Sequence, residues 1–267
     1  MSLELAAQAK DLEEALQEPP PEVGKAAPTT VELIRGVVDV DTGEWQTNAT
    51  VREMTGEDEE ELARLSTREN LSYAEYTSVL LSRAVENVGA LRVSEDPSVL
   101  DNLIVGDRDL LFLGVVKATY GNVRTFVVTC PACEGSSDVL VNLDKDFPVK
   151  QPVNDPRKTR PVTLRDGRPI QVRYPTGKDA QAIAASGDTL AAQNTAIIVQ
   201  CVVWDDDRTD VVKKQWAREL SIADRRLIVS AIVENQPGPT LEEVEAPCAH
   251  CDETVTMVLD WAYLLFG

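Results

Sequence analysis

Apolar and polar positions alternate between residues 31 and 53, a pattern that predicts a β-hairpin turning at residues 41–43. Two acidic stretches with helical spacing follow, at about 57–69 and 71–88. A third helix is expected to begin at Asp107, which can cap its first turn ahead of an apolar run. The order of these elements predicts an α+β protein.

The two ends of the chain have a different pattern. Residues 1–30 are dominated by Ala, Glu and Pro, with six acids and two bases, so they predict an acidic, flexible arm without a core of its own. Residues 123–129 predict a strand that leads into Cys130. The apolar segment 261–267 either folds back onto the core, which we favour, or enters another subunit.

A repeated motif links the two halves of the chain. Residues 51–58 and 172–179 share Val-Arg, Thr-Gly and a final Asp, at an offset of 121 residues. In both copies a Thr and an Asp have capping-box spacing, so each motif predicts the start of a helix after a hairpin; the pairs are Thr55 with Asp58 and Thr176 with Asp179.

Two further matches keep the same order. Asp107-Arg108 matches Asp224-Arg225 at an offset of 117, and the two CxxC pairs match at an offset of 118. Together they predict a tandem duplication, with two related units packed about a pseudo-twofold axis. The predicted parts are an arm at 1–30, a first unit at 31–147, a linker at 148–160 and a second unit at 161–267.

Four of the five cysteines are typical ligands of a structural zinc ion. They form two CxxC turns, and each turn can present two sulfur atoms to one tetrahedral ion; they are Cys130, Cys133, Cys248 and Cys251. The 114 residues between the turns are far more than a compact zinc ribbon needs. Packing of the two units would bring the turns together, so we predict one structural Zn²⁺ per chain, with no open position for catalysis.

Other chemistry of the cysteines stays open as alternatives. His250 lies inside the second CxxC turn and could replace a cysteine or hydrogen-bond a sulfur, and a site without metal is the remaining alternative. A redox dithiol at Cys130 and Cys133 is disfavoured, because a strand rather than a helix is expected to follow the motif. Cys201 lies in an apolar helical stretch and is expected to be a small buried hydrophobe.

Two acidic clusters have a simpler explanation than a cation site. The run 57–61 lies in the first turns of a predicted helix, where the helix dipole favours carboxylates, although a calcium or partner site is an alternative. Residues 205–207 are expected to form a solvated turn, because their spacing fits no metal-binding loop.

The composition limits the classes of function. Of 267 residues, 43% are hydrophobic and 27% are charged, with no apolar run long enough to cross a membrane, so we expect a globular, intracellular protein. The net charge of −19 repels phosphate backbones and anionic membrane surfaces, so neither is expected as the main partner. With one histidine and no phosphate loop or nucleophile motif, the chain is predicted not to be an enzyme.

Three short segments resemble a known family. Residues 101–108 (DNLIVGDR), 118–121 (ATYG) and 127–133 (VVTCPAC) are similar to the T-even phage baseplate protein family, over roughly residues 31–145 and more faintly over 160–267. The resemblance implies a non-catalytic component or assembly factor in the hub or wedge region of a contractile phage tail or injection-system baseplate. Its implied partners are other baseplate or tail subunits, and its implied location is the host cytoplasm during assembly and then the virion tail.

Two other functions stay as alternatives. The first is a tail-assembly chaperone that leaves the finished particle. The second is a zinc-ribbon adaptor that binds other proteins or nucleic acid. Binding of nucleic acid would favour basic and aromatic residues around the CxxC turns, but acidic residues lie there instead: Glu134, Asp138, Glu245, Asp252 and Glu253.

Overall fold

The computed structural model describes residues 24, 26–69, 71–240, 243–258, 261 and 264. This part of the chain contains eight helices and five antiparallel sheets, so the predicted α+β class is confirmed. Most of the arm predicted at residues 1–30 lies outside the described residues. None of the described helices is long and apolar enough to cross a membrane.

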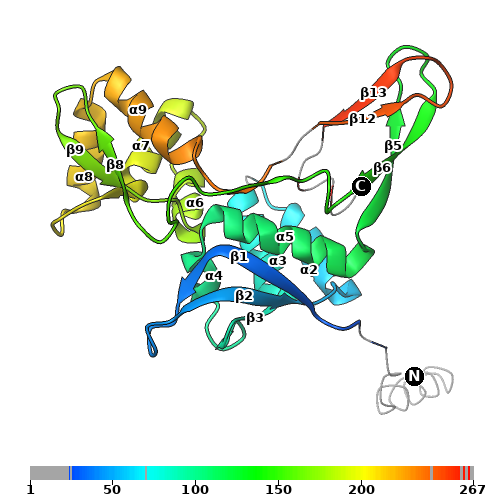
Figure 1. Cartoon of the computed structure of the whole chain (residues 1–267), viewed down its shortest axis with the longest axis horizontal. Helices are drawn as coiled ribbons and strands as arrows, with labels where there is room; N and C mark the ends of the chain where they lie inside the picture. The colour runs from blue at the N-terminus through cyan, green and yellow to red at the C-terminus, as the bar shows by residue number, and fades with distance from the viewer. Residues whose placement is uncertain are drawn as a thin grey trace, which may run out of the picture.

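The first half of the chain builds a four-stranded sheet covered by helices (Figure 1). Its strands, in spatial order, are β1 (Thr29–Val38), β2 (Trp45–Val51), β3 (Val85–Val88) and β4 (Leu91–Arg92). Its helices are α2 (Gly56–Ser66), α3 (Tyr73–Ala84), α4 (Ser98–Asn102) and α5 (Val105–Tyr120). The hairpin predicted between residues 31 and 53 is confirmed as β1 and β2. Helix α5 packs on both of these strands and buries Leu111, Phe112 and Val115 completely.

Two expected helix boundaries were wrong. The helix expected over 71–88 ends at Ala84, because the next four residues pair with β2 as strand β3. The helix expected to begin at Asp107 begins at Val105, and no side chain caps its first turn. Strand pairing with β2 sets the first boundary, and the Asp107 carboxylate binds β1 at the second; local spacing reveals neither contact.

The carboxylate of Asp107 binds the backbone of β1 instead of its own helix. It accepts hydrogen bonds from the N–H groups of Ile34 (2.6 Å), Arg35 (3.2 Å) and Gly36 (2.8 Å). The side chain is completely buried, and burial raises its pKa although these N–H groups lower it. Asp107 therefore ties the start of α5 to the sheet.

The second half builds a smaller sheet of the same kind. Its strands are β8 (Arg160–Thr163), β9 (Pro169–Val172) and β10 (Val202–Val203), with β9 in the centre. Its helices are α6 (Gly177–Ala184), α7 (Leu190–Cys201), α8 (Asp210–Glu219) and α9 (Ile222–Val233). Helices α3 and α7 have the same length, 12 residues, and α7 begins 117 residues after α3.

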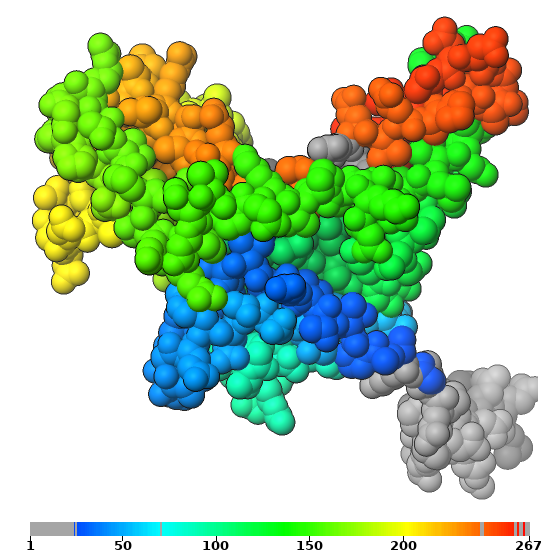
Figure 2. Space-filling model, in the orientation of Figure 1, coloured from blue at the N-terminus to red at the C-terminus, as the bar shows by residue number. Residues whose placement is uncertain are grey.

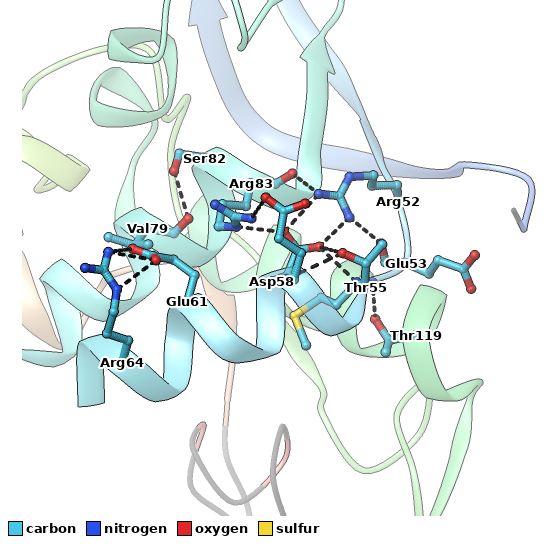
Figure 3. A network of polar contacts seen from close by, with 12 residues as sticks. Arg52, Glu53, Thr55, Asp58, Glu61, Arg64, Val79, Ser82, Arg83 and Thr119 are labelled. Atoms are coloured by element: carbon cyan, nitrogen blue, oxygen red, sulfur yellow. Dashed lines mark hydrogen bonds and ion pairs between the residues drawn. The ribbon is translucent and has the colours of Figure 1, made fainter. Parts of the chain in front are cut away.

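Each half has the same buried Arg–Asp ion pair at the point where its hairpin meets its first helix. Both guanidinium nitrogens of Arg52 donate to the buried Asp58, at 2.7 and 3.1 Å, and Asp58 also accepts from Thr55 N–H in the predicted capping box (Figure 3). In the second half Arg173 donates to Asp179 at 2.5 and 3.0 Å, and Thr176 completes the same capping box. Both helix starts predicted from the repeated motif are confirmed.

Two β-hairpins project from the molecule as a separate arm (Figures 1 and 2). One hairpin is β5 (Val123–Thr129) with β6 (Ser136–Asn142), and the other is β12 (Glu243–Pro247) with β13 (Thr254–Val258). They lie side by side, with β6 against β12 and β5 against β13. The short strands β7 (Val149–Lys150) and β11 (Gly238–Pro239) pair where the chain passes to the second half and back.

The buried apolar side chains form two clusters. The larger cluster joins the first half with all four strands of the hairpin arm, including Phe126, Val139 and Val255. The buried Leu264 belongs to this cluster, and the half-buried Trp261 packs against it, with its ring 5.3 Å edge-on from that of Phe112. For these two described residues the C-terminal segment folds back onto the core, as favoured from the sequence. The smaller cluster belongs to the second half alone.

Candidate metal centre

The two CxxC turns lie at the tips of the hairpin arm. Cys130 and Cys133 occupy the turn between β5 and β6, and Cys248 and Cys251 occupy the turn between β12 and β13. The N–H of Cys130 donates to the carbonyl of Gly135, and the N–H of Cys248 donates to the carbonyl of Glu253, each at 2.9 Å. These bonds close both turns, so each one presents two sulfur atoms toward the other hairpin.

The four sulfur atoms gather at one point. All four lie within 4.8 Å of one another, with Cys130 Sγ 3.8 Å from Cys251 Sγ and Cys133 Sγ 3.7 Å from Cys248 Sγ. Both pairs cross between the hairpins, and both distances are far too long for a disulfide. A tetrahedral ion with metal–sulfur bonds of about 2.3 Å separates its sulfurs by about 3.8 Å. The four cysteines are therefore close enough to hold a metal ion.

Hydrogen-bond donors surround one of the sulfurs. Cys248 Sγ accepts from the N–H of His250 (3.4 Å) and from the hydroxyl of Ser137 (3.5 Å). These two donors favour a thiolate and lower the pKa of Cys248 to about 6. The N–H of Glu253 lowers the pKa of Cys251, but contacts with the other thiols outweigh it and raise that pKa to about 12. A cation at the centre would allow all four to ionise together.

Ser137 and His250 also tie the two hairpins together. Ser137 lies in β6, and its buried Oγ accepts from the N–H of Ala249 in the other turn, at 3.0 Å. The His250 ring lies 2.9 Å from the Ser136 carbonyl through Nε2, so it contacts the first hairpin instead of joining the sulfur cluster. No short motif marks Ser137, so its role could not be predicted from the sequence.

The other candidate residues lie apart from this cluster. Cys201 is completely buried at the end of α7, where burial raises its pKa to about 12, as fits a structural cysteine. Asp206 pairs with Arg208 at 2.7 Å on the surface. In the acidic run 57–61, the helix-start position predicted that Asp58 would be solvated. It is instead buried in its ion pair with Arg52.

Comparison with known proteins decides the family. A family model described as T4 bacteriophage base plate protein matches residues 38–262, which is most of the chain. The chain belongs to this base plate protein family. The resemblance seen in the short segments around Gly106 and Cys130 is thereby confirmed. No curated protein and no solved structure matches this chain.

The family match covers the cysteine cluster and most of the described fold. The matched region contains all four cysteines, the second half of the fold and all of the first half after β1. A base plate protein contacts other tail subunits. The family therefore indicates a structural component of the phage tail.

Proposed function

We propose that the chain is a non-catalytic structural subunit or assembly factor of a contractile phage tail or injection-system baseplate, in its hub or wedge region. The observation that carries this proposal is the family match over residues 38–262. The chain would meet its partner subunits in the host cytoplasm and remain in the tail of the virion. Its acidic surface and projecting arm suit contact with several neighbours.

We further propose that Cys130, Cys133, Cys248 and Cys251 hold one structural Zn²⁺ per chain. Four thiolates in tetrahedral arrangement are typical of zinc or of a mononuclear iron site. The crossing sulfur pairs at 3.7 and 3.8 Å support a single ion between the hairpins. Four sulfur ligands complete its coordination, so the ion would stabilise the arm and carry out no reaction.

Repeated hydrogen bonds support the proposal that the chain is two related units. Arg108 donates to the Leu100 carbonyl and to Ser78 Oγ. Arg225 donates to the Ala217 carbonyl and to Thr195 Oγ1. Each residue of the second set stands 117 positions after its counterpart in the first. A tandem duplication is the simplest origin of such matched contacts, with unit boundaries at 31–147 and 161–267 and a linker at 148–160.

The first test is quantitative proteomics of purified, fully assembled particles from the source. A fixed ratio of this chain to the other baseplate subunits is expected for a permanent component. Presence in assembly intermediates but not in finished particles would make it a chaperone instead. Absence from both would contradict the proposed function.

The metal proposal has its own test. Native mass spectrometry of the purified chain should find one zinc ion, and the mass should fall by one zinc after treatment with a strong chelator. Two zinc ions, or none in protein purified under reducing conditions with zinc present, would contradict one shared site.

A further inference from the structure

The start of α6 is bound to the first half of the chain by main-chain hydrogen bonds. The N–H of Val105 donates to the Pro175 carbonyl (3.0 Å), and the N–H of Gly177 donates to the Leu103 carbonyl (2.9 Å). Ile104 lies between these bonds and is completely buried. This contact places α6 against α3, α4 and α5.

A side chain of α6 completes the contact. The amide of Gln181 donates to Ser78 Oγ in α3 (2.8 Å) and to Asp101 in α4 (3.2 Å). Gln181 thus occupies the space between two helices of the first half. The contact joins the beginning of one unit to a face made of three helices of the other.

The second half has a corresponding face on α7, α8 and α9. Among the described residues, Ala182 of α6 and Ser186, just after α6, reach its α7–α8 side, but none occupies the position that Gln181 has in the first half. Leu220, Ser221 and Ile222 stand 117 positions after Leu103, Ile104 and Val105. Ile104 is fully buried, whereas Ser221 is exposed and Ile222 is 72% exposed. Ile222 corresponds to Val105, which is half-buried beside its hydrogen bond to Pro175, so this apolar residue at the start of α9 is more exposed than its counterpart.

A cavity lies where Gln181 would have its counterpart. It has a volume of about 300 Å³, and its lining includes Thr195 and Arg218, which stand 117 positions after Ser78 and Asp101. Its other charged lining residues are Lys214 and Asp210. Asp210 pairs with Lys213 at 3.7 Å, and no ion pair to Arg218 is found among the described residues. We name the surface formed by Thr195, Lys214, Arg218, Leu220 and Ile222 the α7–α9 face.

The first half carries the segment that would fit this face. Thr55 and Gly56 begin α2 as Thr176 and Gly177 begin α6, but Gly56 is exposed and Gly177 is buried. The counterpart of Gln181, at the offset of 121, is the exposed Glu60. The polar pair Gln181–Asp101 within the chain would therefore become the ion pair Glu60–Arg218 between chains.

We propose that a second copy of this chain docks the start of its α2 onto the α7–α9 face, with Glu60 against Arg218. The charges of the two halves agree with this contact. Without their hairpins, the first half (residues 31–122) holds 18 acids and 8 bases, whereas the second (residues 161–240) holds 10 of each. The two surfaces differ and lie on different parts of the molecule (Figure 1), so the contact is head-to-tail and grows beyond a dimer into a ring or a filament.

Sedimentation velocity of the full-length, metal-loaded chain from about 1 to about 100 μM tests this contact. Wild type is expected to form species larger than a dimer as its concentration rises. Glu60→Arg and Arg218→Glu are each expected to weaken association by at least about tenfold, because each places like charges together. A mixture of the two variants, and the double variant, are expected to restore it. Glu44→Arg, an exposed acid in the β1–β2 turn, is the matched control and should leave association unchanged.

The proposal can fail in three ways that the experiment separates. A chain that stays monomeric throughout the concentration range contradicts self-association. Growth that stops at a dimer contradicts the head-to-tail arrangement. Association that neither charge reversal weakens places the contact on another surface. None of these results bears on membership of a baseplate, which the particle proteomics tests independently.

Discussion

Arg52 binds Asp58 through both of its guanidinium nitrogens, and Arg83 donates to the same carboxylate at 2.7 Å from the end of α3. Burial alone would raise the pKa of Asp58, but the hydrogen bonds from Arg52, Thr55 N–H and Arg83 hold it well below its usual range. One carboxylate thus joins β2, α2 and α3. The buried ion pair makes this junction sensitive to loss of one partner.

Asp58→Asn is expected to reduce the free energy of unfolding by about 3 kcal/mol, because it leaves two arginines without their carboxylate. Urea denaturation at pH 7 measures this loss. Since the pKa of Asp58 is depressed in the folded state, its stabilisation is present above the unfolded pKa of about 4 and is lost as the pH falls below it. Glu59→Gln, on the exposed neighbour, is the control; an equal effect of both variants would refute the role of Asp58.

Cys130→Ser is expected to abolish binding of one metal ion and to lower the melting temperature markedly, because metal binding contributes folding free energy. Differential scanning calorimetry with and without chelator measures the effect. Chelator should destabilise wild type but leave the variant unchanged. Cys201→Ala is the control, because Cys201 is buried away from the cluster and its variant should retain the metal. A variant as stable as wild type would contradict a structural ion.

Ser137→Ala is expected to weaken metal affinity by about tenfold, because groups that hydrogen-bond a metal ligand contribute effects of this size. Ser137 Oγ donates to Cys248 Sγ and links the hairpins through Ala249 N–H. Competition with a chromophoric chelator measures the affinity. Ser136→Ala is the matched control, since Ser136 contacts His250 through its carbonyl. Identical affinities of the two variants would show that the hydroxyl has no part in binding.

Asp109→Asn is expected to stabilise the protein more at pH 8 than at pH 5. Burial in α5 raises the pKa of Asp109 to about 7, although Arg108 lowers it. The folded protein therefore binds this proton more tightly than the unfolded chain, and stability is lost as the pH rises from about 4 through 7. Melting temperatures across this range measure the difference. Asp188→Asn, at an exposed position, should show no such trend.

Local signals in the sequence were sufficient for the hairpins and capped helix starts. Thr55 with Asp58 carries its own three-residue spacing, and the β1–β2 hairpin carries its own turn. The boundaries that failed depend on distant partners. Asp107 has the position of an N-cap, but N–H groups some 70 residues earlier bind its carboxylate more favourably.

The four cysteines of the candidate metal centre could be predicted from the sequence, but the hairpins and hydrogen-bond donors around them could not. The two CxxC turns predicted four sulfur ligands. The repeated motifs indicated that packing of two related units could bring these distant turns together. Sequence did not predict that hairpins would carry the cysteines out on an arm, because that placement depends on packing of β5 and β6 against β12 and β13. The Ser137 contact depends on the same packing.

The position of the cysteines has a topological consequence for the second half. Cys133 and Cys248 bracket 114 residues, including β8–β10 and α6–α9, so a metal ion at the tips closes that whole stretch into a cycle. A cross-link over so long a segment lowers the entropy of the unfolded chain by the equivalent of about 4–5 kcal/mol. A protease that cuts within residues 148–160 would then leave two fragments joined by metal–sulfur bonds in addition to the packing of the hairpins and of α6.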